Sequence, residues 1–305
     1  MSKSLVAVDI GATNIRVAQG SSDGIHQILR ERTSIDGSSG VSLQIIDMIR
    51  RLDDKPDSIG IGSIGPINLE TGEIWNSPNF PYKKVPIIDP LREEFNVSIR
   101  MVNDCAAGVL GEWKYGAGKK HNNIVYITLS TGLGGGAIVD GHLLIGKDGN
   151  AAEIGHITID PESPLLCGCG CMGHWEAYCG GNNIVQLAEY VLGKNFAEYV
   201  KKFGEITADK VFSLAGRGDA DSCKVVEKYG QVNAIGFADV VNVYDPEVLT
   251  VGGSIALNNP ELVLKSIREH IESHLINRKP VIMITPLGED VILHGALALA
   301  NREYN

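Results

Sequence analysis

Short apolar runs separated by polar turns open the chain. Strand-like stretches at 5–8 and 15–18 flank the turn Asp9-Ile-Gly-Ala-Thr13, and a third stretch follows at 25–29. Strands joined by a tight turn of Gly, Thr and Asn are typical of a β-hairpin. Apolar residues then recur at helical spacing over 39–53, which predicts an amphipathic helix.

The rest of the first half continues this alternation. Residues 58–64 are strand-like and end at Gly65-Pro66. Five prolines and many turn residues predict a loop-rich excursion over 66–90. A strand is expected over 98–102, and Asn103-Asp104 then opens a helix, with Asp104 near its N-cap.

The second half repeats the first in kind. Two halves that each combine a hairpin, further strands and helices predict an internally duplicated α/β fold. The predicted elements are a hairpin over 124–139, helices over roughly 175–240, a strand at 247–251, a helix from Pro260, a strand at 281–284 and a helix at 291–300.

Composition narrows the class of protein. A length of 305 residues predicts two domains, and 44% hydrophobic with 21% charged residues is ordinary for a globular protein. The sequence has no apolar run of the roughly 20 residues that a membrane helix needs, and no signal-peptide pattern, so a cytoplasmic protein without membrane contact is expected. A net charge of -10 without a basic block argues against nucleic-acid binding.

Two glycine-rich stretches resemble phosphate loops but lack the right context. Gly60–Gly65 matches G-x-G-x-x-G, yet Pro66 and turn residues follow where a helix should begin. Gly141–Lys147 nearly matches a Walker loop, yet Asp148 replaces the hydroxyl residue that would contact Mg²⁺. Neither stretch is taken as a nucleotide site.

Two other loops suit phosphate better. Residues 9–16 and 130–136 each link two short strands, one loop in each half of the chain. Glycine lets the backbone approach phosphate closely, while Thr13 and Thr131 add hydroxyl donors. Asp9 at the end of the first strand can hold hydrated Mg²⁺. Either loop alone could be an ordinary hairpin turn, but the pair favours a nucleotide.

The loops at 9–14 and 130–136 and the segment Val251-Gly-Gly-Ser resemble the two phosphate segments and the adenosine segment of the actin/hexokinase/heat-shock-70 ATPase superfamily. The resemblance implies a two-domain duplicated ribonuclease-H-like fold, with ATP and sugar in the interdomain cleft. Mg²⁺ would accompany ATP. The implied nucleotide-binding residues are Asp9, Gly11, Thr13, Asn14, Arg16, Thr131, Gly132, Gly134, Gly252 and Gly253.

Within that superfamily the chain resembles the ROK family (repressors, open reading frames, kinases) along essentially its whole length. The motifs that carry this resemblance are Val102-Asn-Asp104, Glu153-Ile-Gly-His156 and the segment Cys167–Glu176. It implies ATP-dependent phosphorylation of a hexose 6-hydroxyl by a homodimer or homotetramer. The implied domains are a small α/β domain at 1–111, joined by the C-terminal helix at about 290–305, and a large α/β domain at 112–289 with a zinc-binding loop.

The resemblance makes Asp104 the general base that accepts the proton of the sugar hydroxyl. The alternative is that Asp104 only caps its helix, and one residue can do both. The family often has a Trp shortly after its Pro-Asn-Leu segment, whereas Phe80 and Tyr82 follow here, which puts that contact in doubt. The implied sugar-binding residues are Gly65, Asn79, Asn103, Asp104, Glu153, His156 and Glu176.

Four of the six cysteines crowd between residues 167 and 179, and a tight Cys-x-Cys-x-Cys set in a cytoplasmic chain indicates a metal. The resemblance makes His156, Cys167 and Cys169 ligands of a structural zinc ion. Where the family has its fourth ligand, a cysteine, this chain has His174, and an extra Cys171 lies three residues earlier. Zinc accepts either, and the register favours His174. Free buried thiols are the alternative.

Three other functions are alternatives to a glucokinase or broad-specificity hexokinase. The Glu153, His156 and Glu176 set is shared with N-acetylmannosamine kinases, although Pro66 and Asn79 look more like the glucose-type members. A non-catalytic sugar-sensing regulator would not need Asp104. A DNA-binding repressor carries a helix-turn-helix first, for which a strand beginning by residue 5 leaves no room.

Overall fold

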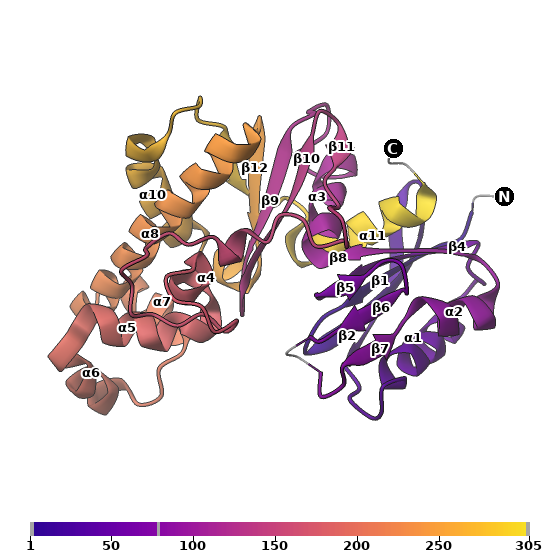
Figure 1. Ribbon diagram of the computed structural model, residues 1–305, viewed down its shortest axis with the longest axis horizontal. Helices are drawn as coiled ribbons and strands as arrows, with labels where there is room; N and C mark the ends of the chain where they lie inside the picture. The colour runs from indigo at the N-terminus through magenta and orange to yellow at the C-terminus, as the bar shows by residue number, and fades with distance from the viewer. Residues whose placement is uncertain (1–2, 78–79, 303–305) are drawn as a thin grey trace. The chain divides into compact units, whose positions relative to one another are not determined.

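The computed structural model describes residues 3–77 and 80–302, and the chain divides into two compact units (Figure 1). The predicted duplicated α/β architecture is confirmed, because each of two mixed sheets has five strands. The expected domain limits, with a change near residue 111, stay a prediction. Unit 1 comprises residues 1–126, 136–152 and 285–305, and unit 2 comprises residues 127–135 and 153–284.

The first sheet consists of β1 (Leu5–Ile10), β2 (Asn14–Ser21), β3 (Gly24–Arg32), β4 (Ser58–Ser63) and β8 (Ser98–Asn103). Its order is β3-β2-β1-β4-β8, with β1 antiparallel to β2 and parallel to β4. All six residues of β1 are buried, because alternate side chains face two different cores. Val6 and Val8 belong to one core, whereas Leu5 and Ala7 belong to the other.

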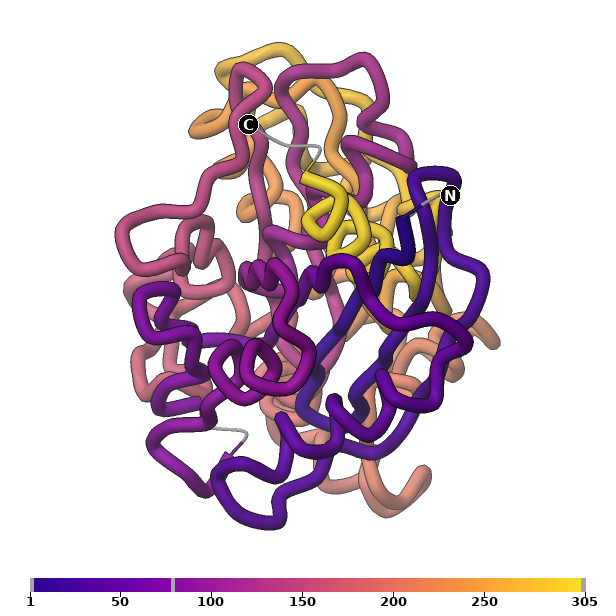
Figure 2. The backbone as a smooth tube through the Cα atoms, turned by 90° about the vertical axis from the view of Figure 1, so that its right-hand side faces the viewer, coloured from indigo at the N-terminus to yellow at the C-terminus, as the bar shows by residue number. Residues whose placement is uncertain are grey.

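Helices cover this sheet. The last helix packs on β1 and β4 and lies beside the N-terminal strands in both views (Figures 1 and 2). It also packs closely on the helix that begins at Asp104: a Cβ added at Gly295 would lie 1.7 Å from the Ala107 carbonyl oxygen. The helix behind Asp104 is thereby held in place. The helices of unit 1 are α1 (Gly40–Arg50), α2 (Ile88–Phe95), α3 (Asp104–Lys114), the 3₁₀ helix η5 (Gly288–Asp290) and α11 (Val291–Asn301).

The second sheet consists of β9 (Ile124–Leu129), β10 (Leu133–Val139), β11 (His142–Leu143), β12 (Val248–Gly252) and β13 (Val281–Ile284). Its order is β11-β10-β9-β12-β13, and β12 is parallel to β13. In each sheet, three strands that are consecutive in the sequence lie side by side, and two strands from later in the chain extend the sheet from the first of the three. The two sheets thus have the same strand order, as expected for the predicted duplication.

The segment 66–90 is more ordered than the expected loop-rich excursion. It carries a three-stranded sheet of β5 (Ile67–Asn68), β6 (Glu73–Trp75) and β7 (Lys84–Pro86). These strands have only two or three residues each, which is too short to give a recognisable period of hydrophobicity.

Helices fill most of unit 2, as predicted. Trp175 anchors them, because its fully buried ring packs on Phe237 with centroids 5.6 Å apart and its Nε1 donates to Asn233 Oδ1 at 3.0 Å. This anchor fixes the position of the following residue, Glu176. Among the described residues no helix is both long and apolar enough to cross a membrane. The helices are η1 (Ile154–His156), α4 (Trp175–Cys179), η2 (Gly181–Asn183), α5 (Ile184–Leu192), η3 (Gly193–Asn195), α6 (Phe196–Phe203), α7 (Ala208–Gly216), α8 (Ala220–Tyr244), α9 (Ser254–Asn258), α10 (Pro260–His270) and η4 (Ile271–His274).

Candidate active site

The first predicted phosphate loop is the turn between β1 and β2 in unit 1. Gly11 N donates to Asn14 O at 3.0 Å, and a Cβ at Gly11 would lie 2.9 Å from that oxygen, so the turn needs glycine there. Thr33, directly after β3, holds the turn, since its N donates to Thr13 O at 3.0 Å and its Oγ1 to Gly11 O at 2.8 Å. The Thr13 side chain stays exposed, as a phosphate donor must be.

Asp9 is buried and paired with Arg16, its partner across the β1–β2 hairpin. Arg16 Nε and Nη2 donate to Asp9 Oδ2 at 2.8 and 2.6 Å, and Arg16 Nη1 donates to Asp290 Oδ1 at 3.1 Å. Burial raises the pKa of Asp9, although the Arg16 guanidinium opposes the shift. The structure thus places two carboxylates on Arg16, which the sequence had suggested as a nucleotide contact.

Asn103 and Asp104 lie where β8 ends and α3 begins. Asn103 is the N-cap, and its Oδ1 accepts from Cys105 N at 2.9 Å. Asp104 Oδ1 accepts from the same N–H at 2.7 Å, so both side chains meet the first turn of the helix. Gly65 is nearby, since a Cβ there would lie 3.2 Å from Asn103 Nδ2. Asn79 lies outside the described residues.

The second phosphate loop, between β9 and β10 in unit 2, is tied to Glu176. Leu133 N donates to Glu176 Oε2 at 2.9 Å, and a Cβ at Gly132 would lie 2.6 Å from the same oxygen. The loop backbone is held further by Gly181 N, which donates to Ser130 O at 2.8 Å. Thr131 therefore lies in a fixed turn, and Gly134 continues into β10.

The predicted adenosine segment joins this loop in unit 2. Gly252 ends β12, and Gly253 has a φ of 84°, where a Cβ would lie 2.4 Å from Leu129 O. Ser254 Oγ is 3.1 Å from Ser130 Oγ. The residues predicted for the second phosphate and for adenosine are thus side by side.

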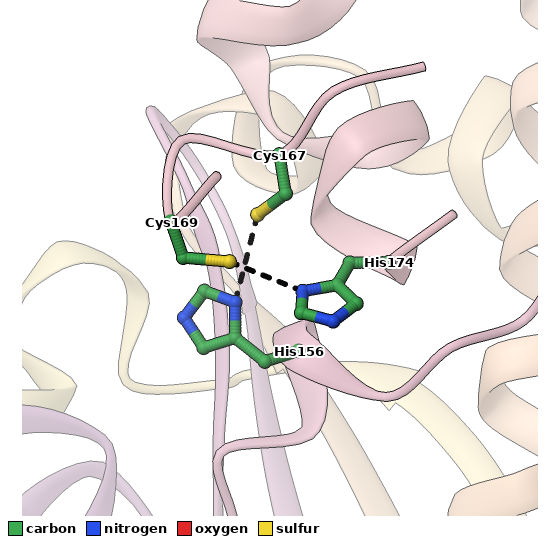
Figure 3. A group of neighbouring side chains, drawn as sticks. All are labelled: His156, Cys167, Cys169 and His174. Carbon is green, nitrogen blue, oxygen red and sulfur yellow. Dashed lines mark hydrogen bonds between the residues drawn. The ribbon is translucent and has the colours of Figure 1, made fainter. Parts of the chain in front are cut away.

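A separate group of His and Cys side chains lies in the loop before α4 (Figure 3). One ligand atom from each lies within 4.8 Å of every other, with Cys167 Sγ 3.6 Å from His156 Nδ1 and Cys169 Sγ 3.3 Å from His174 Nδ1. Two sulfur and two imidazole nitrogen atoms are a donor set that zinc prefers. The predicted cluster is confirmed as a group able to hold an ion.

A tight hairpin brings the two cysteines together. Cys167 N donates to Cys171 O at 2.8 Å, and Gly170 N donates to Cys167 O at 2.9 Å with a φ of 91° at Gly170. Among the described residues the group that could hold a metal contains His174, whereas the exposed Cys171 is not a member of it. The choice of His174 as ligand stays a prediction.

The electrostatics of this loop fit a cation. Burial, with smaller contributions from the Cys169 side chain and Glu176, raises the pKa of the Cys167 thiol to about 12, although the Cys169 N–H opposes the shift. A dication would reverse this effect because it stabilises the thiolate.

His156 connects the metal group to the predicted sugar residues. Its Nδ1 faces Cys167, while its Nε2 lies 4.0 Å from Glu153 Oε2. Cys167 Sγ is also 3.5 Å from Glu176 Oε1. Partial burial raises the pKa of Glu153, with Glu176 adding to the shift and His156 opposing it. The structure brings Glu153, His156 and Glu176 together in unit 2.

The sequence profile of the ROK family matches residues 5–303. The chain belongs to the ROK family. It is 38% identical to a glucokinase of Pyrobaculum calidifontis, over 97% of this chain and 94% of that protein.

The ROK fold is found in two similar solved structures. A ROK hexokinase from Thermus thermophilus has a TM-score of 0.86 and 28% identity, with 98% of each chain covered. A ROK family glucokinase from Streptomyces griseus, in complex with glucose and AMPPNP, has a TM-score of 0.82 and 28% identity, covering 98% of this chain and 99% of that one.

Sequence reasoning missed two residues of this ROK protein. Asp290 contacts Arg16 across 274 positions, and its own surroundings in the sequence carry no motif. Asn150 contacts Ile67 across 83 positions. Both pairings depend on the tertiary fold, so local patterns held no signal for them.

Proposed function

We propose that the protein phosphorylates the 6-hydroxyl of a hexose with ATP, and that glucose is its main substrate. The observation that carries the proposal is 38% identity to a glucokinase along nearly the whole length of both chains. The positions of the candidate residues support it, because each unit gathers its predicted residues at strand ends and turns.

In this mechanism Asp104 is the base. As the 6-hydroxyl oxygen attacks the γ-phosphorus, its proton passes to the Asp104 carboxylate and ADP leaves. The sugar is held by Asn103, Glu153, His156 and Glu176, which pair with its hydroxyls. Asn103 Oδ1 accepts from the helix, so its Nδ2 is the group that donates to the sugar. Gly65 and Asn79 complete the predicted contacts.

ATP binds the two glycine-rich turns and the Gly252-Gly253 segment. Backbone N–H groups and the Thr13 and Thr131 hydroxyls contact phosphate oxygens. Asp9 would hold a hydrated Mg²⁺, which supplies positive charge to the phosphates. Arg16 fixes Asp9 through the two hydrogen bonds to Oδ2. The other members of this set are Gly11, Asn14, Gly132 and Gly134.

We propose that His156, Cys167, Cys169 and His174 hold one structural zinc ion. The ion would fix the Nδ1 face of His156, so that Nε2 is aimed at the sugar. Cys171 is the competing fourth ligand. The same proposal includes a homodimer or homotetramer as the assembled form.

The test is ADP release by the purified protein with glucose, mannose, fructose, N-acetylglucosamine and N-acetylmannosamine. We expect glucose to give the highest kcat/KM. If the protein phosphorylates only N-acetylmannosamine, that sugar is the substrate and glucose is not. If no sugar is phosphorylated, the result favours a regulator without catalytic activity.

A further inference from the structure

Asn150 makes a paired contact with the backbone of Ile67. Ile67 N donates to Asn150 Oδ1 at 3.1 Å, and Asn150 Nδ2 donates to Ile67 O at 3.1 Å. One side-chain amide thus satisfies both polar groups of one residue, which fixes that residue in two directions at once. Both residues belong to unit 1.

The segment that carries Asn150 is itself held in place. Ala151 N donates to Ile145 O at 3.1 Å. Gly149 has a φ of 94°, and a Cβ there would lie 2.7 Å from Leu69 Cγ, so the backbone at Gly149 lies directly against the segment after β5. The backbone on either side of Asn150 is therefore held by contacts of its own.

Gly65 lies beside this amide and beside Asn103. A Cβ at Gly65 would be 3.2 Å from Asn103 Nδ2 and 3.6 Å from Asn150 Oδ1. Asn103 in turn precedes Asp104 and caps its helix. The hydrogen bonds from Asn150 to Ile67 consequently help to fix the position of the Gly65–Ile67 backbone beside the Asn103 amide.

We propose that Asn150 is a positioning residue for the sugar, because it holds the Gly65–Ile67 turn against Asn103 at the end of β8. The inference rests on the proposed function. Asn150 acts through the turn, since its Oδ1 and Nδ2 are both engaged by Ile67. Loss of the pair would let the turn move, and a sugar hydroxyl next to Asn103 would lose its fixed surroundings.

The alternative is that Asn150 has a purely structural role, in which its contacts with Ile67 only stabilise the small sheet β5-β6-β7. Asn68 provides the matched control, because its Oδ1 accepts from Glu70 N at 2.9 Å and from Thr71 N at 3.1 Å in the turn after β5. Asn68→Ala therefore removes two backbone contacts of an asparagine amide from the same sheet.

The experiment compares Asn150→Ala, Asn150→Asp and Asn68→Ala by steady-state kinetics with glucose and ATP. In Asn150→Ala we expect the KM for glucose to rise about 10-fold and the KM for ATP to stay within about twofold. Asn150→Asp keeps the acceptor for Ile67 N but turns an oxygen towards Ile67 O, so it should be impaired at least as much. Asn68→Ala should change neither KM by more than about twofold.

Amide hydrogen exchange provides a second measurement. The Ile67 N–H should exchange faster in Asn150→Ala than in the unmodified protein, and should be unaffected in Asn68→Ala.

Three results would overturn the assignment. They are an unchanged KM for glucose in Asn150→Ala, equal rises in both KM values, and an equal defect in Asn68→Ala. If the unmodified protein phosphorylates no hexose, the proposed function fails and the sugar role fails with it. An active unmodified protein with a normal Asn150→Ala variant removes the role of Asn150 alone.

Discussion

The Asn103–Asp104 junction and the His156–His174 loop are built on different principles. The junction joins a strand to a helix, and nearly all of α3 behind it is buried. In the loop, Leu166 and Met172 are 51% and 62% exposed, and Cys169 and Cys171 are exposed as well. Apolar burial therefore stabilises most of the junction, whereas in the loop only a few side chains, among them Leu165 and Cys167, are buried.

This difference indicates which interactions fix the side-chain positions in each region. Strand pairing and helix packing fix the junction before any ligand binds. In the loop, the side chains of His156, Cys167, Cys169 and His174 converge, and an ion bound by them would contribute directly to folding of the loop. The proposed base should consequently be independent of metal, while the proposed sugar residues of unit 2 should depend on it.

The largest effect is expected for Asp104→Asn. The amide keeps the size of the carboxylate but accepts no proton, so kcat should fall by about 10²-fold or more while sugar binding is largely kept. Zinc content should be normal, since the junction is held by its own elements. Steady-state kinetics and metal analysis measure both. Near-normal turnover would rule out Asp104 as the base.

The second prediction compares His174→Ala with Cys171→Ser. Loss of the true fourth ligand should lower zinc from about one per chain and weaken sugar affinity about 10-fold, because His156 loses its fixed orientation. Affinity for ATP should change little. Calorimetric sugar binding and metal analysis on the same samples provide the measurement.

The non-ligand variant serves as the control and should keep both properties. We expect Cys171→Ser to be that control, because Cys171 lies outside the group of four. If both variants keep full zinc, the fourth ligand is a different group, and the proposed set of four is wrong.

Removing zinc with a chelator should affect the His156–His174 loop but not the Asn103–Asp104 junction, and this test needs no mutation. Protease cleavage within 157–174 should become faster by about fivefold, because the exposed loop opens locally when its ion is lost. Cleavage in 98–114 should stay as slow as before. Mass spectrometry of the fragments locates the cuts, and equal acceleration in both regions would contradict the comparison.

The smallest effect concerns Glu112, near the end of α3. It is fully buried, accepts from Thr285 Oγ1 and Ala117 N, and has a pKa that burial raises above the usual 4.5. The folded state therefore keeps this proton at pH values where the unfolded chain has lost it. The free energy of unfolding contributed by Glu112 should fall as pH rises from about 4.5 towards the raised pKa.

Glu112→Gln does not titrate; its oxygen can still accept from Ala117 N, and its Nε2 can donate to Thr285 Oγ1. Its free energy of unfolding should depend less on pH than that of the unmodified protein across this window. Denaturant unfolding at pH 5 and pH 8 gives the two values. A variant with unchanged pH dependence would show that Glu112 does not contribute.

Local signals explain which features could be predicted. The β1–β2 hairpin, the helix after Asn103 and the Cys/His group depend on residues close in sequence or on motifs with fixed spacing. The pairing of Arg16 with Asp290 and the pairing of Asn150 with Ile67 each need the folded chain to bring distant residues together. The short strands of the β5-β6-β7 sheet also gave no periodic signal, because they hold two or three residues each.

The position of α11 has a consequence for synthesis of the protein. Leu5, Ala7 and Ala18 in the first strands share one core with Leu293 and Leu297 of this last helix. During synthesis, one apolar face of the first sheet therefore lacks its covering helix until α11, residues 291–301, has been translated, whereas unit 2 ends at residue 284. During that interval the apolar face that Leu5, Ala7 and Ala18 share with α11 is exposed to solvent, which is where a partly synthesised chain is prone to aggregate.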